Sequence, residues 1–197
     1  KALLANLDKL TPAQKAIVLA DLEKRDALFE KQQARDTFMG FVNRVWPDFI
    51  GGRHHSIMAK AFERVANGEC KRLIINMPPR HTKSEFASYL LPSWYLGRNP
   101  GKKVIQCSNT AELAVGFGRK VRNLVDAEQY AEVFPNVSLR VDSKAAGRWA
   151  TSGGGEYFAI GVGGTVTGKG ADLLIIDDTH SEQDAALAAG DPSVYDK

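Results

Sequence analysis

The sequence predicts an α/β fold in which a mainly parallel sheet is flanked by helices and preceded by an N-terminal helical segment. Two observations support this prediction. Apolar runs with the length of buried strands end in polar residues. Between them lie longer stretches whose apolar residues recur with helical spacing. This alternation is typical of parallel strands joined by right-handed crossovers. We place the helical segment at 1–50 and the α/β domain at 51–197.

The composition fits one folded domain. The 197 residues are 44% hydrophobic and 25% charged, which is enough apolar material for a core of ordinary size. A net charge of +3 is too small to indicate nucleic-acid binding by itself. The two cysteines lack metal or redox spacing. Because we find no signal peptide and no apolar run near the roughly 20 residues that cross a bilayer, we expect an intracellular protein outside the membrane.

Three helices are expected in the first third of the chain. Thr11-Pro12-Ala13-Gln14 is a capping-box pattern, so a charged helix should run from there to about Ala34. Asp36 can cap a second helix, and Asn67-Gly68 can end a third. Their apolar faces have helical spacing, with Phe38, Phe41, Val42 and Val45 in the second helix and Met58, Ala61, Phe62 and Val65 in the third.

The rest of the chain alternates between strands and helices, except over 127–150, where no pattern is clear. A glycine-rich turn is expected at 163–170, and Pro92 should kink or end the helix in which it lies. The predicted strands are 72–77, 103–107, 157–162 and 171–178, and the predicted helices are 83–96 and 111–126.

Residues 72–84 have the order of a phosphate-binding loop, with an apolar strand, a short loop, and Lys83-Ser84 at the start of a helix. Backbone N–H groups and the helix dipole at such a start attract an anion, the lysine reaches the β- and γ-phosphates, and the serine hydroxyl ligates Mg²⁺. Met77 and Thr82 stand where the G-x-x-x-x-G-K-[ST] pattern has its glycines. The match is therefore incomplete, and Lys83-Ser84 taken alone could be an ordinary helix start.

A later strand ends in two acids. Residues 173–176 are Leu and Ile, and Asp177 and Asp178 follow. Because the carboxyl ends of parallel strands meet at one edge of a sheet, both carboxylates should lie near the phosphate loop. Mg²⁺ is usually held by one or two carboxylates together with phosphate oxygens. Asp177 is therefore the expected Mg²⁺ ligand, directly or through water, although an acid pair taken alone could be a solvated strand exit.

Several stretches together resemble the large terminase subunits of tailed bacteriophages. Residues 77–85, Met-Pro-Pro-Arg-His-Thr-Lys-Ser-Glu, are similar to the degenerate Walker A sequence of that family. The likeness extends to His54-His55, to 108–122 and to 163–178, and in all covers residues 38–185 or so. Thr82 departs from the small Gly or Ser that is usual at its position.

The resemblance implies a P-loop NTPase fold of the ASCE or RecA-like type, in the N-terminal ATPase domain of a DNA-packaging motor. Such a motor hydrolyses ATP with Mg²⁺ to drive double-stranded DNA into a procapsid. Its implied partners are the portal protein of the procapsid, the small terminase subunit, and further copies of itself in a ring on the capsid, in the host cytoplasm during virion assembly. The coupling motif and the nuclease domain of the family are expected beyond Lys197, so we expect no nuclease site here.

The resemblance also implies roles for individual residues. Lys83 would bind the β- and γ-phosphates, and Ser84 and Asp177 would hold Mg²⁺. Asp178 would orient the attacking water, with Glu182 as a weaker candidate for that role. The full set of nucleotide-binding residues would be Pro78, Pro79, Arg80, His81, Thr82, Lys83, Ser84 and, near the adenine, His55.

Three of these assignments have simple alternatives. Arg80 could sense the γ-phosphate in its own subunit, or it could pair with a nearby acid. Arg119, or Arg122 on the same helix, could reach a neighbouring subunit as an arginine finger, or it could lie on a solvated helix face. His54 and His55 could lie near the adenine, or they could be surface or capping residues at a helix start.

Two other functions remain open at this point. One is a helicase-like nucleic-acid ATPase, which would depend on a DNA end or fork rather than on a procapsid. The other is a catalytically silent nucleotide-binding module kept for assembly, because the loop lacks its glycines and Asp178 stands where Glu is more usual. A DNA motor needs sequence-independent phosphate contacts, and the candidates for these are Lys169, Lys102, Lys103 and Arg98.

Overall fold

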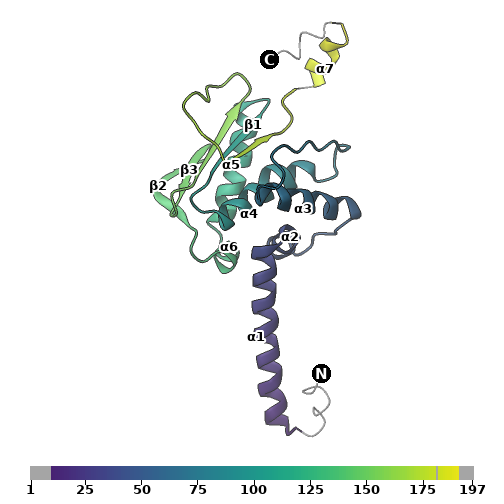
Figure 1. Ribbon diagram of the computed structural model, residues 1–197, viewed down its shortest axis with the longest axis vertical. Coiled ribbons are helices and arrows are strands. Elements are labelled where there is room, and N and C mark those ends of the chain that lie inside the picture. Colours follow the sequence, from purple (N-terminus) through teal and green to yellow (C-terminus); the bar gives the residue numbers. More distant parts are fainter. Residues whose placement is uncertain (1–9, 181, 191–197) are drawn as a thin grey trace.

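The computed structural model describes residues 10–180 and 182–190. It is an α/β structure with an N-terminal helix, which confirms the predicted class. Helix α1 (Pro12–Asp36) extends from a rounded body that contains the sheet (Figure 1). Helix α7 (Glu182–Ala188) follows the last strand and lies at the far end from α1 (Figure 1).

The sheet has five strands in the order β2-β3-β4-β1-β5. Strand β1 lies between β4 and β5 and is parallel to both, whereas β2, β3 and β4 pair antiparallel. Two of the four pairings are therefore antiparallel, and the prediction of a mainly parallel sheet is wrong. Short connections permit only antiparallel neighbours, and the unassigned stretch 127–150 supplies them. The strands are β1 (Lys103–Ser108), β2 (Leu139–Ala145), β3 (Arg148–Thr151), β4 (Glu156–Gly161) and β5 (Leu173–Ile176).

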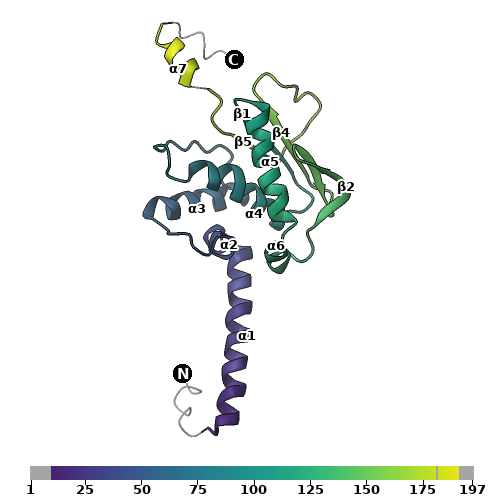
Figure 2. The same ribbon diagram turned by 180° about the vertical axis from the view of Figure 1, so that it is seen from behind.

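Helix α5 (Ala111–Val125) follows β1 and contacts both β1 and β4, and from behind it is seen to run alongside these strands (Figure 2). Thr110 caps it by accepting a hydrogen bond from the Leu113 N–H at 3.1 Å. The remaining helices are α2 (Phe38–Val45), α3 (Arg53–Ala66), the π-helical segment η2 (Glu85–Leu90), α4 (Leu91–Arg98) and α6 (Glu128–Val133).

The helix after the phosphate loop continues through Pro92 and ends at Arg98, so Pro92 does not end it. Just before the proline the helix widens, because the Leu91 N–H bonds to the Phe86 carbonyl five residues back. Proline has no N–H, and its ring crowds the carbonyl of the preceding turn. The wider π turn gives that ring room, and the helix runs on.

The helix caps agree with the sequence in two places and differ in one. The Thr11 capping box is present, with Gln14 N–H donating to Thr11 Oγ1, and Gly68 follows the end of α3 with φ 78°. Thr37, not Asp36, caps α2, because the extended backbone at Thr37 lets its hydroxyl accept from Gly40 N–H at 3.0 Å. Asp36 instead ends α1.

The predicted strand over 72–77 is absent from the sheet in the described chain. Strand β5 ends the sheet on that side, and β1 is its neighbour there. Residues 72–78 make no backbone–backbone hydrogen bond to any other described residue. Instead, Leu73, Ile74 and Ile75 face β5 across a groove of about 800 Å³. The prediction of a strand over 72–77 is therefore wrong, because these residues lie beside β5 without backbone pairing to it.

A cluster of aromatic rings joins the N-terminal helices to the body. The Phe38 ring lies 5.3 to 5.7 Å from the rings of Phe62, Phe86 and Trp94. Trp94 Nε1 also donates to the Ala34 carbonyl at 3.2 Å. These residues are almost fully buried, and they belong to the same core as the sheet residues. The helix that follows the phosphate loop is thus fixed on its inner side by α1, α2 and α3.

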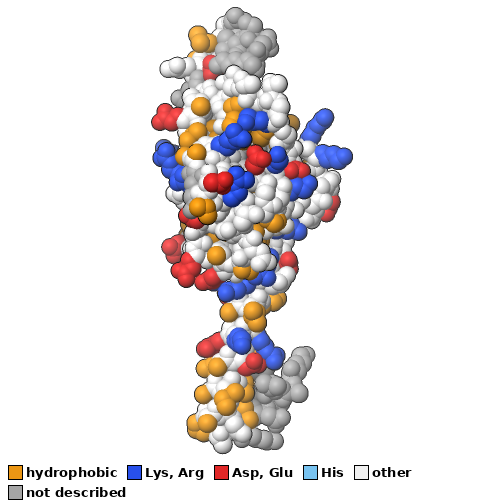
Figure 3. Space-filling view, turned by 90° about the vertical axis from the view of Figure 1, so that its left-hand side faces the viewer, with side chains coloured by type: hydrophobic (Ala, Val, Ile, Leu, Met, Phe, Trp, Pro, Cys, Tyr) orange, Lys and Arg blue, Asp and Glu red, His pale blue; other side chains and the backbone are white. Residues whose placement is uncertain are grey.

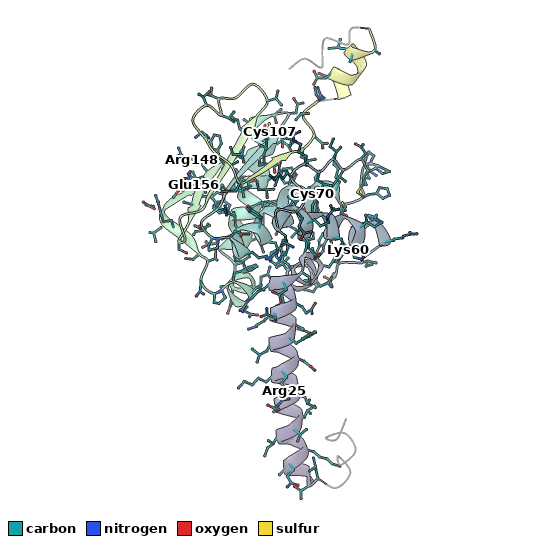
Figure 4. The ribbon with its side chains drawn as sticks, viewed as in Figure 1. Arg25, Lys60, Cys70, Cys107, Arg148 and Glu156 are labelled. Carbon is teal, nitrogen blue, oxygen red and sulfur yellow. The ribbon has the colours of Figure 1, made fainter. Side chains whose placement is uncertain are left out.

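The surface of α1 is partly apolar. In the space-filling view, hydrophobic side chains are spread along its narrow free part (Figure 3), and Ile17, Leu28 and Phe29 are at least 60% exposed. Figure 4 shows Arg25 on this free part, away from the body. The two cysteines are free and come from different regions, with Cys70 after α3 and Cys107 in β1 (Figure 4). In the described chain, no helix is long and apolar enough to cross a membrane.

Candidate functional site

The loop before Lys83 has an unusual backbone. Arg80 has φ 63° and Thr82 has φ 60°, both in the left-handed region that glycine prefers. Thr82 stands where the phosphate-loop pattern has its second glycine, so this chain keeps the backbone conformation without the glycine. A β-branched residue in this region is strained, by about 1–3 kcal/mol. The helix begins at Lys83, as predicted.

A buried histidine supports this strained loop. The Gly52 N–H donates to His55 Nδ1 at 2.8 Å, so the ring hydrogen of neutral His55 lies on Nε2. Nε2 is 2.6 Å from Thr82 Oγ1, and that hydroxyl donates in turn to the His81 carbonyl. Burial, and then the neighbouring His54 and His81, lower the pKa of His55 below its usual range. His55 is therefore neutral near pH 7 and holds the loop from inside, and its predicted contact with adenine stays a prediction.

Lys83 joins the loop to the acidic end of β5. Its Nζ is 3.0 Å from Asp178 Oδ1 and 3.5 Å from Asp177 Oδ1. The hydrogen bond to Asp178 raises the pKa of Lys83; partial burial opposes this shift, and the charge of Asp177 adds to it. Lys83 is therefore a cation throughout the neutral range. The structure thus brings together the three residues that the sequence predicted to meet.

Asp177 is buried and firmly held. Its side chain is 6% exposed, and its backbone N–H donates to the Cys107 carbonyl at 3.0 Å, extending the β1–β5 ladder by one residue. Its Oδ2 accepts a hydrogen bond from Ser88 Oγ at 2.8 Å. The other oxygen, Oδ1, faces Lys83. A buried carboxylate is costly unless it is paired in this way.

Asp178 has a different setting. Its backbone is left-handed, with φ 48°, and its carbonyl accepts from Asn109 N–H at 2.9 Å. This turn directs the chain away from the sheet and leaves the Asp178 side chain 60% exposed, next to Lys83. A carboxylate that is exposed and near a cation can contact water and substrate, whereas Asp177 beside it cannot leave the core.

The site opens into the groove between 70–75 and β5. Lys83, Asp177 and Asp178 line this groove together with many apolar side chains, and Lys71, Arg72 and Asp172 line it as well. A volume of about 800 Å³ is within the range of small-molecule sites. The arrangement therefore offers a cation and two carboxylates beside a cleft large enough for a nucleotide.

The residues present fit Mg²⁺ only in company with a phosphate. Asp177 Oδ1 and the half-buried Ser84 on the first helical turn are oxygen donors, which Mg²⁺ prefers. Over the described residues, no group of three or more His, Cys, Asp or Glu side chains could hold a metal by itself. A site with one or two carboxylates is the kind in which Mg²⁺ binds together with substrate phosphates.

The other predicted site residues lie on the outer loop, on α5 and at the start of α7. Pro78, Pro79, Arg80 and His81 form the exposed outer part of the loop. Arg119 is exposed on α5, and no contact joins it to Lys83, Asp177 or Asp178 in the described chain. Glu182 begins α7, but its side chain lies outside the described residues.

The four basic residues predicted as DNA contacts all have partners within the chain. Two of them form ion pairs, Lys102 with Asp172 at 2.7 Å and Lys103 with Glu156 at 3.0 Å. The other two lie over aromatic rings, with the Arg98 guanidinium 4.7 Å from the centre of the Trp94 ring and Lys169 Nζ 4.0 Å from the centre of the Phe158 ring.

Two buried polar residues at the site were missed by the sequence analysis. Ser88 contacts Asp177, and Gln106 contacts Ser88 at 3.2 Å. Gln106 interrupts the apolar run of Val104, Ile105 and Cys107 in β1, and such an interruption is a signal that could have singled it out. Ser88 has no comparable signal in the sequence, although it is buried in the π-helical segment.

No protein-family model, no curated protein and no solved structure matches this chain. A function therefore has to be argued from the site and from the sequence motifs.

Proposed function

We propose that this chain is a Mg²⁺-dependent ATP hydrolase of the P-loop type. The observation that supports this best is that Lys83 lies beside Asp177 and Asp178. Lys83 and Asp178 are 95 positions apart in the sequence. A lysine at a helix start, next to carboxylates at a strand end, is the arrangement that P-loop NTPases use for phosphoryl transfer. The left-handed loop before Lys83 and the groove beside it supply room for the phosphates and the nucleoside.

The chemistry follows from the charges. A water molecule attacks the γ-phosphorus, and the bond between the γ-phosphorus and the ADP oxygen breaks. The phosphate oxygens compete with Asp178 for Lys83, which moves to the β- and γ-phosphates and stabilises the charge that develops there. Asp178, no longer paired, accepts a hydrogen bond from the attacking water and orients it. Ser84 and Asp177 would hold Mg²⁺, which would supply positive charge against the charge that develops on the phosphate.

We further propose that the ATPase belongs to a tailed-phage terminase large subunit and drives double-stranded DNA into a procapsid. This step rests on the order and spacing of the sequence motifs that resemble that family. Its partners would then be DNA, the portal of the procapsid, the small terminase subunit and neighbouring copies of the chain, to which exposed Arg119 would contribute the arginine finger. Hydrolysis that rises with procapsids and DNA together distinguishes this motor from a helicase-like ATPase, which responds to DNA alone.

The first test is ATP hydrolysis with Mg²⁺ by the wild type and by Lys83→Ala, with ATP binding measured in parallel. We expect the wild type to bind and hydrolyse ATP, and the variant to lose turnover by about 10²-fold or more, because it lacks the charge that stabilises the transition state. Lys102→Ala is a matched control, since Lys102 also pairs with an acid of the β5 region but lies at the opposite end of the strands.

The outcomes separate the possibilities clearly. Lost turnover in Lys83→Ala with normal turnover in Lys102→Ala supports the phosphate site. Near-normal hydrolysis by Lys83→Ala contradicts it, and so does a wild type that does not bind ATP.

One observation favours a second candidate, a nucleotide-binding module without turnover. Asp178 is paired with Lys83 at 3.0 Å, so the residue that should orient water is already engaged. Wild-type protein that binds ATP in the presence of Mg²⁺ but leaves it intact over many hours favours this module.

A further inference from the structure

The two oxygens of Asp177 have different surroundings. Oδ2 accepts a hydrogen bond from Ser88 Oγ at 2.8 Å, on the buried side. Oδ1 is 3.5 Å from Lys83 Nζ, on the side of the groove. The carboxylate is therefore oriented, with one oxygen committed to the core and one directed at the site.

The hydrogen bonds behind Asp177 have a fixed direction. A carboxylate can only accept, so the Ser88 hydroxyl hydrogen must point to Asp177. The Ser88 oxygen is then free to accept, and Gln106 Nε2 donates to it at 3.2 Å. This determines the orientation of the Gln106 amide, whose Nε2 also lies 3.5 Å from Ser108 Oγ. The chain of donors runs from Gln106 through Ser88 to Asp177.

The supporting residues come from two other elements. Gln106 is in β1, next to the Cys107 labelled in Figure 4, and pairs in register with Ile175 of β5. Ser88 is in the π turn η2, which follows directly from Lys83 and Ser84. Turns of this kind are frequent at functional sites, because they redirect one side chain without ending the helix. Here Ser88 is the buried polar residue of the segment.

Stability alone does not account for this pair. Ser88 and Gln106 are both fully buried, and the Gln106 Oε1 has no hydrogen-bond partner among the described residues. A buried polar atom without a partner costs about 1–3 kcal/mol, and apolar side chains in these positions would avoid that cost. The presence of Ser88 and Gln106 is explained if their role is to orient the Asp177 carboxylate.

We propose that Ser88 and Gln106 are positioning residues that make Asp177 a one-oxygen ligand and thereby select Mg²⁺ over Ca²⁺. The proposal rests on the proposed function, in which Asp177 holds the metal of a metal–ATP complex. Mg²⁺ requires compact octahedral geometry, whereas Ca²⁺ accepts both oxygens of a carboxylate. With Oδ2 bound to Ser88, Asp177 offers Oδ1 alone, which suits Mg²⁺. Removal of the Ser88 hydroxyl frees Oδ2 and allows the two-oxygen mode that Ca²⁺ favours.

The test is equilibrium binding of a fluorescent ATP analogue, in EDTA and in titrations with Mg²⁺ or Ca²⁺. We expect Ser88→Ala to need about 10- to 100-fold more Mg²⁺ for the same binding, which is the usual loss when a group behind a metal ligand is removed. The preference for Mg²⁺ over Ca²⁺ should fall as well, while binding in EDTA should stay as in the wild type. Gln106→Ala should shift both quantities in the same direction but by less.

Two comparisons separate positioning from a structural effect. If Gln106 acts through Ser88, the double variant Ser88→Ala/Gln106→Ala should bind Mg²⁺–nucleotide as Ser88→Ala does. Ser93→Ala is the matched control, because Ser93 is an equally buried serine on the same helical run that donates to the Tyr89 carbonyl instead. If Ser88→Ala does not fold, Ser88→Cys keeps a weak donor of similar size, and we expect an intermediate shift.

An unchanged Mg²⁺ requirement and an unchanged Mg²⁺/Ca²⁺ preference in a folded Ser88 variant overturn the inference but leave the ATPase proposal intact. A shift of the same size in the Mg²⁺ requirement of Ser93→Ala overturns it too, because the loss of any buried hydroxyl on this helix would then have the same effect. If wild-type binding of the nucleotide does not depend on a divalent cation, or if Lys83→Ala hydrolyses ATP as the wild type does, the proposed function fails and this inference fails with it.

Discussion

The two sides of the site are built in different ways. On the strand side, Asp177 is 6% exposed and is held by the Cys107 carbonyl and the Ser88 hydroxyl. On the loop side, residues 78–81 are exposed and Arg80 and Thr82 are left-handed. His55 contacts this side through a hydrogen bond to Thr82, and the His54 ring lies 5.8 Å from the His81 ring. Lys83 connects the two sides.

Because of this difference, the two sides are suited to different roles. Movement of a buried, hydrogen-bonded carboxylate costs free energy, so the strand side is suited to holding a metal in one geometry. Segments with few backbone hydrogen bonds adjust at low cost, so the loop side is suited to closing around phosphates of varied position. Three predictions test this contrast.

The largest effects are expected from the two adjacent acids, and they should differ in kind. Asp177→Asn should lose the Mg²⁺-dependent part of ATP binding and about 10²–10³-fold in turnover, because it removes a charge that holds the metal. Asp178→Asn should keep Mg²⁺-dependent binding and lose about 10²–10⁴-fold in turnover, because it removes only the group that orients water. Parallel measurements of binding and of steady-state hydrolysis distinguish the two patterns.

Equal losses of binding in both variants would contradict the contrast between a buried and an exposed acid. Glu128→Gln is a suitable control, since it removes an exposed carboxylate in α6, which is not part of the site.

The sequence was sufficient to predict most of the elements and the meeting of Lys83 with Asp177 and Asp178. It succeeded because apolar runs, caps and strand ends are local signals, as at Thr110 before α5. It failed where pairing depends on distant partners. The run 72–77 has the composition of a strand, but composition does not determine whether another edge lies within hydrogen-bonding distance.

The support behind the site was also beyond local signals. The contacts of Ser88 and His55 join residues 89 and 27 positions apart in the sequence. The fold buries the His55 ring against Phe49 and Phe86 and directs Nε2 at Thr82, and the motif around His55 does not predict this support of the loop. Long-range side-chain contacts of this kind follow from the packing of elements and not from periodicity.

The next largest effect is expected at His55. His55→Ala leaves the Gly52 N–H without its acceptor and removes the hydrogen bond to the Thr82 hydroxyl. It should therefore lower the free energy of unfolding by about 1–3 kcal/mol in urea denaturation at pH 8. The wild type should also lose stability as the pH falls below 6.5. The unfolded chain takes up a proton there, whereas the lowered pKa of folded His55 delays its protonation to lower pH.

His55→Ala should therefore show a weaker pH dependence of stability between pH 8 and 5 than the wild type. His54→Ala, on the same helical turn, keeps the hydrogen bond between His55 and Thr82. It should retain most of the pH dependence, because burial lowers the pKa of His55 more than the charges of His54 and His81 do. A pH dependence that is identical in His55→Ala and the wild type would show that His55 does not hold the loop as a neutral group.

The smallest effect, and the most direct measure of strain on the loop side, is expected at Thr82. Thr82→Ala keeps a side chain at φ 60° and loses the hydrogen bond to His55, so it should lower the free energy of unfolding by about 1–2 kcal/mol. Thr82→Gly loses the same bond but also relieves the left-handed strain, worth about 1–2 kcal/mol. Because glycine regains flexibility in the unfolded chain, at a cost of about 0.5–1 kcal/mol, the two variants should differ by less than that strain, with glycine the more stable. Urea denaturation of the pair measures this difference directly, and alanine equal to or more stable than glycine would mean that the loop is not strained at this position.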